Sequence, residues 1–373
     1  MRLIALLALL AVPVFAVPDS TNGWGYDLDS LDRDLAVWKA HPDVRIDSIG
    51  ASVQGRPIWM VSITDRSDSV APVSGRAGPK RRVVAHARTH PWEVQSQRVA
   101  NGMIAALLEP TDEAAALRRD FLFHFIPQYN PDGIVLGSQR FNANGVDLEG
   151  NWSAPVMEPE AASLKRLFQG FMVGANPVDV ALNLHSDQFN CTRFFFYHLP
   201  GGTSELYAAQ EKTFIADIQA RFPGGIEDWN FVASWATAPV LRYPEGFWWS
   251  GWREKVMALT YEDANCPDAG LFDSTGRALV EGTGAYLRQV PQAAEHKADS
   301  RSLRLEGAEI VFGGELGGCR WETRDAKGRR MTTGIVSSTS LKVSDIVPPG
   351  RGMSVFLVRR PDGGLERILL SPR

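Results

Sequence analysis

Cysteine, net positive charge and long apolar runs are all scarce in this sequence. Its 373 residues include three cysteines, too few to hold a fold together by disulfides, so the structure must depend on a buried core. The formal net charge of −4 provides no basic field for a phosphate backbone, and we expect no nucleic-acid partner. Hydrophobic residues make up 44% and charged residues 22%, which is typical of a globular chain with one large domain and a small one.

One apolar run stands apart at the N-terminus. Arg2 is followed by an apolar stretch over 3–16 that is too short to span a bilayer comfortably, with Val14 and Ala16 placed as at a signal-peptidase site. We therefore predict a signal peptide over 1–16 and a secreted or periplasmic protein with no stable membrane insertion after cleavage. The alternative is an uncleaved anchor, which Pro13 and Pro18 disfavour.

Strands and helices are predicted to alternate along most of the chain. The β-branched run at 83–87 precedes a stretch at 93–108 with helical spacing, and patterns of buried strands return at 121–126, 178–184 and 255–261. Such alternation favours an α/β fold with three layers, α/β/α, around a mixed central sheet.

Two other stretches break this alternation. The aromatic-rich segment at 231–252 has no clear period, and we expect it to be irregular. From residue 302 onward, short alternating runs are separated by Gly, Asp and Pro turns. This change predicts a main domain over 17–298 and a small all-β sandwich domain over 299–373.

Side chains that suit a metal ion follow three of the predicted strands. His90 and Glu93 come after the first, with Pro91 expected in the first turn of the next helix. His185 and Glu262 end two later strands. Two imidazoles and a carboxylate are a known ligand set for a catalytic zinc, which keeps a fourth position for water. Because His-x-x-Glu alone occurs by chance, this prediction depends on the other residues.

Five short motifs that occur in a fixed order strengthen the prediction of a metal site. They are Gly50-x-Ser52-x-x-Gly55-Arg56-Pro57, His90-x-x-Glu93, Asn130-Pro131-Asp132-Gly133 with Arg140, Gly145-Val146-Asp147-Leu148, and Leu184-His185-Ser186, followed by Glu262. In this order they make the chain resemble the zinc carboxypeptidases of the metallocarboxypeptidase (M14) family over about residues 31–288.

The resemblance implies a role for each residue. His90, Glu93 and His185 would bind one Zn²⁺ per chain within a peptidase domain over 17–298. Glu262 would act as the general base toward the attacking water, and Arg140 would contact the substrate and stabilise the oxyanion. The expected partner is a peptide or a peptide-like substrate, and the oligomeric state is left open.

One departure from the family bears on the substrate. Where the family has Asn-Arg, which holds the C-terminal carboxylate of the substrate, this chain has Glu149 and Gly150. A carboxylate would meet repulsion there rather than an arginine fork. Glu149 could instead meet an ammonium group, such as the free amine of diaminopimelate in a bacterial wall peptide. The alternative is that Glu149 turns away and that Arg193 or Arg242 binds the carboxylate.

A substrate-facing tyrosine and the wider function also leave alternatives. Tyr243 is our prediction for the tyrosine, although other aromatics compete as cleft or core residues: Trp248, Trp249 and Tyr261. Besides a secreted metallopeptidase, the residues allow a zinc amidohydrolase or deacylase of related fold, or an inactive secreted binding module. The intact metal ligands and Glu262 argue against the binding module.

The cysteines could form one disulfide. Cys191 and Cys266 each follow shortly after a predicted site residue, His185 and Glu262, so a bond between them is possible if their strands are neighbours. Two buried free thiols are the alternative. Cys319 would be left over.

Overall fold

The computed structural model describes most of the main domain and the strands of the C-terminal region. The described residues are 25–66, 80–173, 176–187, 191–228, 241–266, 269–290, 303–306, 309–312, 319–325, 329–336, 340–342, 354–359 and 365–370. The predicted signal peptide lies outside them. None of the described helices is both long and apolar enough to cross a bilayer.

The main domain alternates strands and helices. In chain order its elements are α1 (Leu28–Trp38), β1 (Val44–Ala51), β2 (Pro57–Ile63), β3 (Arg81–Ala87), α2 (Val94–Leu108), α3 (Asp112–Asp120), β4 (Phe121–Ile126), α4 (Pro131–Val135), α5 (Pro159–Met172), β5 (Val178–Asp187), β6 (Phe194–Phe195), α6 (Glu205–Gln219), α7 (Pro244–Trp252), the 3₁₀ turn η1 (Arg253–Lys255), β7 (Met257–Ala264) and α8 (Phe272–Gln289).

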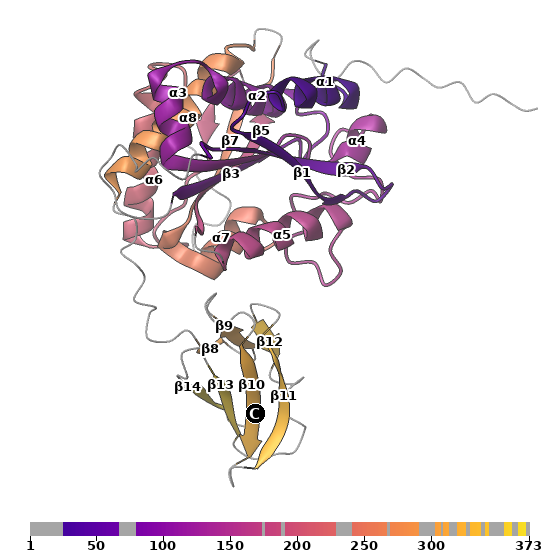
Figure 1. Ribbon diagram of the computed structural model, residues 1–373, viewed down its shortest axis with the longest axis vertical. Helices are drawn as coiled ribbons and strands as arrows, with labels where there is room; N and C mark the ends of the chain where they lie inside the picture. The colour runs from indigo at the N-terminus through magenta and orange to yellow at the C-terminus, as the bar shows by residue number, and fades with distance from the viewer. Residues whose placement is uncertain are drawn as a thin grey trace, which may run out of the picture.

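A seven-stranded sheet in the order β1-β2-β4-β3-β5-β7-β6 forms the middle layer. The four strands β4, β3, β5 and β7 are parallel to one another, whereas β1, β2 and β6 pair antiparallel with their neighbours. Figure 1 shows α1, α2, α3, α6 and α8 over one face and α5 and α7 over the other. The predicted three-layer α/β/α fold with a mixed sheet is confirmed.

Side chains of the central strand β3 alternate between two buried clusters. Val83, Ala85 and Ala87 pack with the helices of one face, while Val84 packs with residues from the opposite layer. Successive side chains of a strand point to opposite faces of the sheet. Because helices cover both faces here, a central strand needs hydrophobic residues on both of its sides. The carboxyl ends of β3, β5 and β7 consequently meet at one edge of the sheet, where ligands bind in α/β proteins.

Several predicted boundaries were right and others need correction. Strand 121–126 matches β4, and helix 93–108 matches α2, which begins one residue later. Pro91 is not in the first helical turn, because it lies in a separate turn before the N-cap residue Glu93. The stretch predicted to be irregular contains the helix α7, whose N1 residue is Pro244. Residues 229–240 lie outside the described part of the chain.

The described residues of the C-terminal region lie in β-strands and their connections, as predicted. Strands β10 (Arg320–Asp325), β11 (Arg330–Ile335), β13 (Ser354–Arg359) and β14 (Leu365–Leu370) form one antiparallel sheet, and β8 (Leu303–Glu306), β9 (Glu309–Phe312) and β12 (Ser340–Lys342) form another. Phe356 is fully buried, with its ring stacked on Trp321 at 5.3 Å. A small β domain therefore follows the main domain.

Candidate metal centre

The turn between β3 and α2 presents the first two candidate ligands. Arg88 at its start has a left-handed backbone with φ of 58°, which is uncommon for a residue with a side chain. Its buried guanidinium donates to the carbonyl of Pro91 at 2.8 Å and to that of Tyr26 at 3.1 Å. Ser96 accepts from the Arg88 amide and donates to the Glu93 carbonyl. These bonds fix the shape of the turn around His90.

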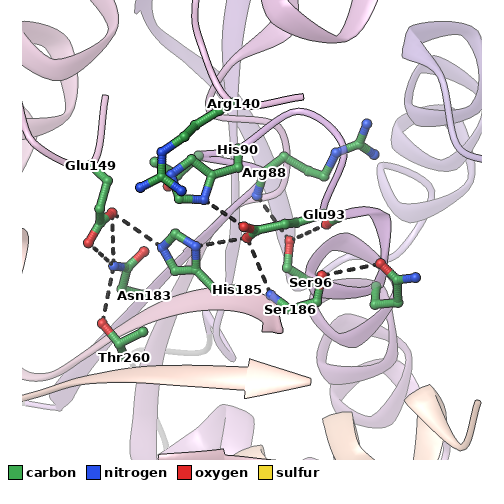
Figure 2. Close-up of polar contacts among 12 residues, drawn as sticks. Arg88, His90, Glu93, Ser96, Arg140, Glu149, Asn183, His185, Ser186 and Thr260 are labelled. Atoms are coloured by element: carbon green, nitrogen blue, oxygen red, sulfur yellow. Dashed lines mark hydrogen bonds and ion pairs between the residues drawn. The ribbon is translucent and has the colours of Figure 1, made fainter. Parts of the chain in front are cut away.

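Glu93 is the N-cap residue of α2, yet its carboxylate does not cap the helix. Its Oε1 lies 2.6 Å from Nδ1 of His90, and its Oε2 lies 2.8 Å from Nδ1 of His185 on β5. The helix start thus directs a carboxylate between two imidazoles that are far apart in the sequence (Figure 2).

The three predicted ligands form one compact, buried group. One donor atom from each of His90, Glu93 and His185 lies within 4.8 Å of the others. Their exposed fractions are only 4%, 4% and 3%. Two imidazole nitrogens and a carboxylate are the donors of a catalytic zinc site with an open fourth position, so the residues fit this metal.

Electrostatics at the cluster favour positive charge. Burial opposes ionisation of Glu93, but the two imidazoles hold the pKa of its carboxyl well below the usual range. Burial acts to lower the pKa of His90, yet Glu93 and Asp147 raise it to about 9. Burial likewise acts against a charge on His185, whose pKa is raised well above its ordinary value by Glu93 and Glu149. The carboxylates that retain these protons would also attract a divalent cation.

Two further carboxylates lie behind the imidazoles. Asp147 Oδ1 is 3.3 Å from Nε2 of His90, and Glu149 Oε2 is 3.2 Å from Nε2 of His185. Asp147 belongs to the Gly-Val-Asp-Leu motif, for which the sequence indicates no separate role. Residues 147–149 lie outside the helices and strands, so no periodicity of the sequence signals that Asp147 and Glu149 both face the cluster.

Arg140 is brought to the site by Asp147. Its Nε donates to Asp147 Oδ2 at 2.7 Å, and 45% of its side chain is exposed. Figure 2 shows Arg140 beside His90. Arg140 is thus an exposed cation next to the cluster.

The Asn-Pro-Asp-Gly motif and the motif of the β1–β2 hairpin pack together and support the loop that leads to Arg140. Asp132, in the Asn-Pro-Asp-Gly motif, is fully buried and accepts 2.7 Å hydrogen bonds from Ser52 Oγ, the Gln54 amide and Arg56 Nη1 of the β1–β2 hairpin. Gly133 leaves no space for a side chain, because a Cβ there would lie 2.3 Å from Pro91 Cγ. The hairpin, the loop that leads to Arg140 and the His90 turn are thus packed together.

Glu262 lies next to the cluster in the sheet. It is the register partner of His185 in the parallel pair β5–β7, and paired residues of parallel strands point to the same face. Both strands continue two residues beyond the predicted ends, to Asp187 and Ala264. Glu262 is partly buried.

The structure does not bring Tyr243 or the two alternative arginines into the described contacts of the cluster. Tyr243 is the N-cap residue of α7, and its hydroxyl accepts from Arg242 at 2.6 Å. Arg193 pairs with buried Asp263 at 3.3 Å. Each of these side chains has partners away from His90, Glu93 and His185.

Cys191 and Cys266 form a disulfide, with their Cα atoms 5.6 Å apart. One of the two predicted alternatives is thereby confirmed. The bond links the segments that follow β5 and β7, which are the strands of His185 and Glu262.

Comparison with known proteins agrees with this geometry. Residues 35–195 match the M14 peptidase family, described as zinc carboxypeptidase. This match covers the part of the chain that holds His90, Glu93 and His185, and the residue types and arrangement of this cluster are those expected for zinc.

Individual relatives are similar over parts of their length. Cytosolic carboxypeptidase 6 of Caenorhabditis elegans is 28% identical over 213 residues, which are 54% of this chain and 43% of the relative. Cytosolic carboxypeptidase 2 of Danio rerio is 37% identical over 101 residues, which are 27% of this chain and 14% of the relative. The chain thus spans less than half the length of these curated relatives.

Solved structures share the fold. A metallo-carboxypeptidase from Burkholderia cenocepacia superposes with a TM-score of 0.59 at 22% identity, covering 70% of this chain and 69% of that one. A metallo-carboxypeptidase from Pseudomonas aeruginosa, in complex with (2-guanidinoethylmercapto)succinic acid, gives 0.60 at 22% identity with the same coverage. At this identity the likeness concerns the fold.

Proposed function

We propose that the protein is a zinc-dependent hydrolase that cuts an amide bond of a peptide or peptide-like substrate. The observation that carries the proposal is the convergence of His90, Glu93 and His185 on one point, with Glu262 beside His185 in the neighbouring strand. These three residues would hold a zinc ion, which when bound would polarise the scissile carbonyl and lower the pKa of a water molecule.

The residues of the chain supply the remaining steps. Glu262 accepts a proton from the attacking water and returns it to the leaving amine, as a general base and then acid. Arg140 donates to the oxyanion that forms on the carbonyl oxygen. Asp147 holds Arg140 by one oxygen and His90 by the other, so it couples the oxyanion donor to a ligand.

Digestion of a peptide library, read by mass spectrometry, tests the proposal. The purified zinc-loaded chain should cleave, and Glu262→Gln should lower the rate at least about 10²-fold, within the range of general-base catalysis. Glu281→Gln on α8 is the matched control, since this glutamate contacts Arg277 instead of the cluster. Cleavage at an unchanged rate by Glu262→Gln would refute the role of Glu262, and no cleavage by the wild type would refute the hydrolase.

Substrate recognition is proposed to differ from that of the family. Glu149 and Gly150 stand where the family has its carboxylate-binding Asn-Arg pair. Glu149 retains 12% side-chain exposure, so an edge of its carboxylate can still face a cationic group. A substrate with an ammonium near the scissile bond, such as a wall peptide, suits this site better than one held only by its terminal carboxylate.

Export is part of the same proposal. The Cys191–Cys266 disulfide supports an oxidising compartment, where such bonds persist. Mass spectrometry of the protein recovered from the producing cells, by fraction, is the test. A mature N-terminus at Val17 in the periplasm or the medium supports export, and an intact chain in the cytosol contradicts it.

A further inference from the structure

Two carboxylates separated by one residue face different imidazoles of the cluster. Asp147 contacts Nε2 of His90, and Glu149 contacts Nε2 of His185, at 3.3 and 3.2 Å. Leu148 between them is fully buried and anchors the segment. The two contacts are therefore equivalent, one for each histidine.

The nitrogen that each carboxylate contacts is the one that faces away from Glu93. In both histidines Nδ1 points to Glu93 and thus to the centre of the cluster, which leaves Nε2 outward. An imidazole that binds a metal through Nδ1 carries its proton on Nε2, and an outer carboxylate that accepts this proton fixes the tautomer and the ring orientation.

Glu149 is itself held in place from β5. The amide of Asn183 donates to Glu149 Oε1 at 3.0 Å and to Oε2 at 3.2 Å. Asn183 lies two residues before His185 on β5 and is 2% exposed. It also donates to Glu245 Oε1 at 3.3 Å. As Figure 2 shows, Glu149 meets His185 and Asn183 together.

We infer that Glu149 is the positioning residue of His185: it accepts the Nε2 proton and raises the affinity of the site for zinc, as Asp147 does for His90. This inference rests on the zinc site of the proposed function. Position 149 then serves mainly the metal site. A carboxylate accepts from an imidazole more strongly than an amide does, which is a physical reason for the absence of an asparagine there.

The test is the zinc affinity of the purified full-length chain, measured by competition with a chromophoric chelator and without substrate. Glu149→Gln keeps the size of the side chain and removes its charge. It should weaken zinc binding about 10- to 100-fold, the usual loss for an outer carboxylate. Asp147→Asn should give a loss of the same order.

Glu245→Gln is the matched control. Glu245 accepts from the same Asn183 and is 6% exposed, but it also accepts from Thr260, and neither of these hydrogen bonds involves His90 or His185. Burial and the nearby Glu149 raise the pKa of Glu245, which favours its neutral form. A neutral glutamine of similar size is therefore a close substitute for it. The zinc affinity of this variant should stay within about threefold of the wild type, below the loss expected for an outer carboxylate.

The possible outcomes separate the two proposals. If Glu149→Gln binds zinc as tightly as the wild type, or if Glu245→Gln loses as much affinity, Glu149 is not a positioning residue. If the wild type itself binds no zinc at one equivalent, the zinc site and the proposed function fail first. Thermal unfolding of each metal-free variant shows whether a loss reflects the site or the whole fold.

Discussion

Asp147 joins Arg140 to the metal centre: its Oδ2 accepts from Arg140 Nε at 2.7 Å, while its Oδ1 lies 3.3 Å from Nε2 of His90. The cation that we assign to the oxyanion therefore has its orientation set by the carboxylate that also supports a metal ligand. Changes at the two residues should consequently have different effects.

Arg140→Ala should lower kcat/KM about 10²- to 10³-fold, as loss of an oxyanion donor does. Zinc affinity should change little, because the hydrogen bond of Arg140 is to Asp147 rather than to one of the three ligands. Steady-state kinetics and chelator competition on the same preparation give both numbers. Arg45→Ala, at an exposed pair with Asp47, is the control, and equal activity of the two variants would contradict the role of Arg140.

Buried Asp132 should be important for stability. Three donors of the β1–β2 hairpin converge on it, including Arg56 at 2.7 Å. Asp132→Asn cannot accept all three hydrogen bonds and removes the charge that pairs with Arg56, so we expect a loss of about 2–4 kcal/mol in the free energy of unfolding. Urea denaturation measures it. Asp47→Asn, where the pair is exposed, should cost less than about 1 kcal/mol, and similar losses in both variants would count against this support.

Much of the fold and the ligand set could be predicted from local sequence. The run at 83–87 and the strand before His185 are strongly apolar, and strand ends in an α/β protein collect at one edge. His90, Glu93 and His185 could therefore be placed together, which the structure confirms. The family resemblance supplied the order of the motifs.

The features that could not be predicted from the sequence depend on contacts between distant segments. The contact of Glu149 with His185 joins residues 36 positions apart, and a charge reversal by itself does not tell whether a carboxylate faces a substrate or an imidazole. Helix α7 was missed because its aromatic residues pack on more than one side, so they lack a helical period. Pro91 was misplaced since proline suits a turn as well as a first helical residue.

Buried His124 should make the fold sensitive to acid. Burial, with a contribution from Arg82, lowers its pKa to about 3, against about 6.5 in an unfolded chain. Between these values the unfolded chain binds a proton that the folded chain does not, so stability falls as pH falls from about 6.5 toward 3. Through this proton the wild type should lose about 2 kcal/mol of unfolding free energy between pH 7 and pH 5. The variant His124→Gln should not show that part of the loss.

Urea denaturation at the two pH values measures that difference, and the wild type supplies the reference slope. His41→Gln is the control, because 26% of the His41 side chain is exposed. The same pH dependence in His124→Gln and the wild type would show that His124 does not cause the acid sensitivity.

The Cys191–Cys266 bond should stabilise the carboxyl ends of β5 and β7. It closes a loop with a sequence separation of 75, and a bond across such a loop is typically worth about 2–4 kcal/mol. The double variant Cys191→Ala/Cys266→Ala should lose this amount in urea denaturation under oxidising conditions. Under a strong reductant the wild type should approach the variant, and a wild type that is insensitive to the reductant yet equal to the variant would show that the bond contributes nothing.

Gly150 offers a direct test of how the substrate is held. A Cβ built on it would meet only the Asp147 carbonyl oxygen, at 3.9 Å, so a longer side chain fits at its base. Gly150→Arg would introduce the arginine that the family resemblance leads one to expect near this position, and a guanidinium pairs with a carboxylate in a bidentate manner. We expect the ratio of kcat/KM for a peptide with a free C-terminus to that for its amide to rise about tenfold or more, equivalent to about 1.4 kcal/mol.

Gly150→Gln is the matched control, since it adds a side chain of similar reach without the charge. The ratio of the two substrates cancels any change in zinc occupancy, so it reports recognition of the carboxylate alone. A wild type that already prefers the free acid strongly, with no further gain in Gly150→Arg, would mean that another cation of the chain binds the carboxylate. In that case the exchange at positions 149 and 150 would have altered the metal site without altering the class of substrate.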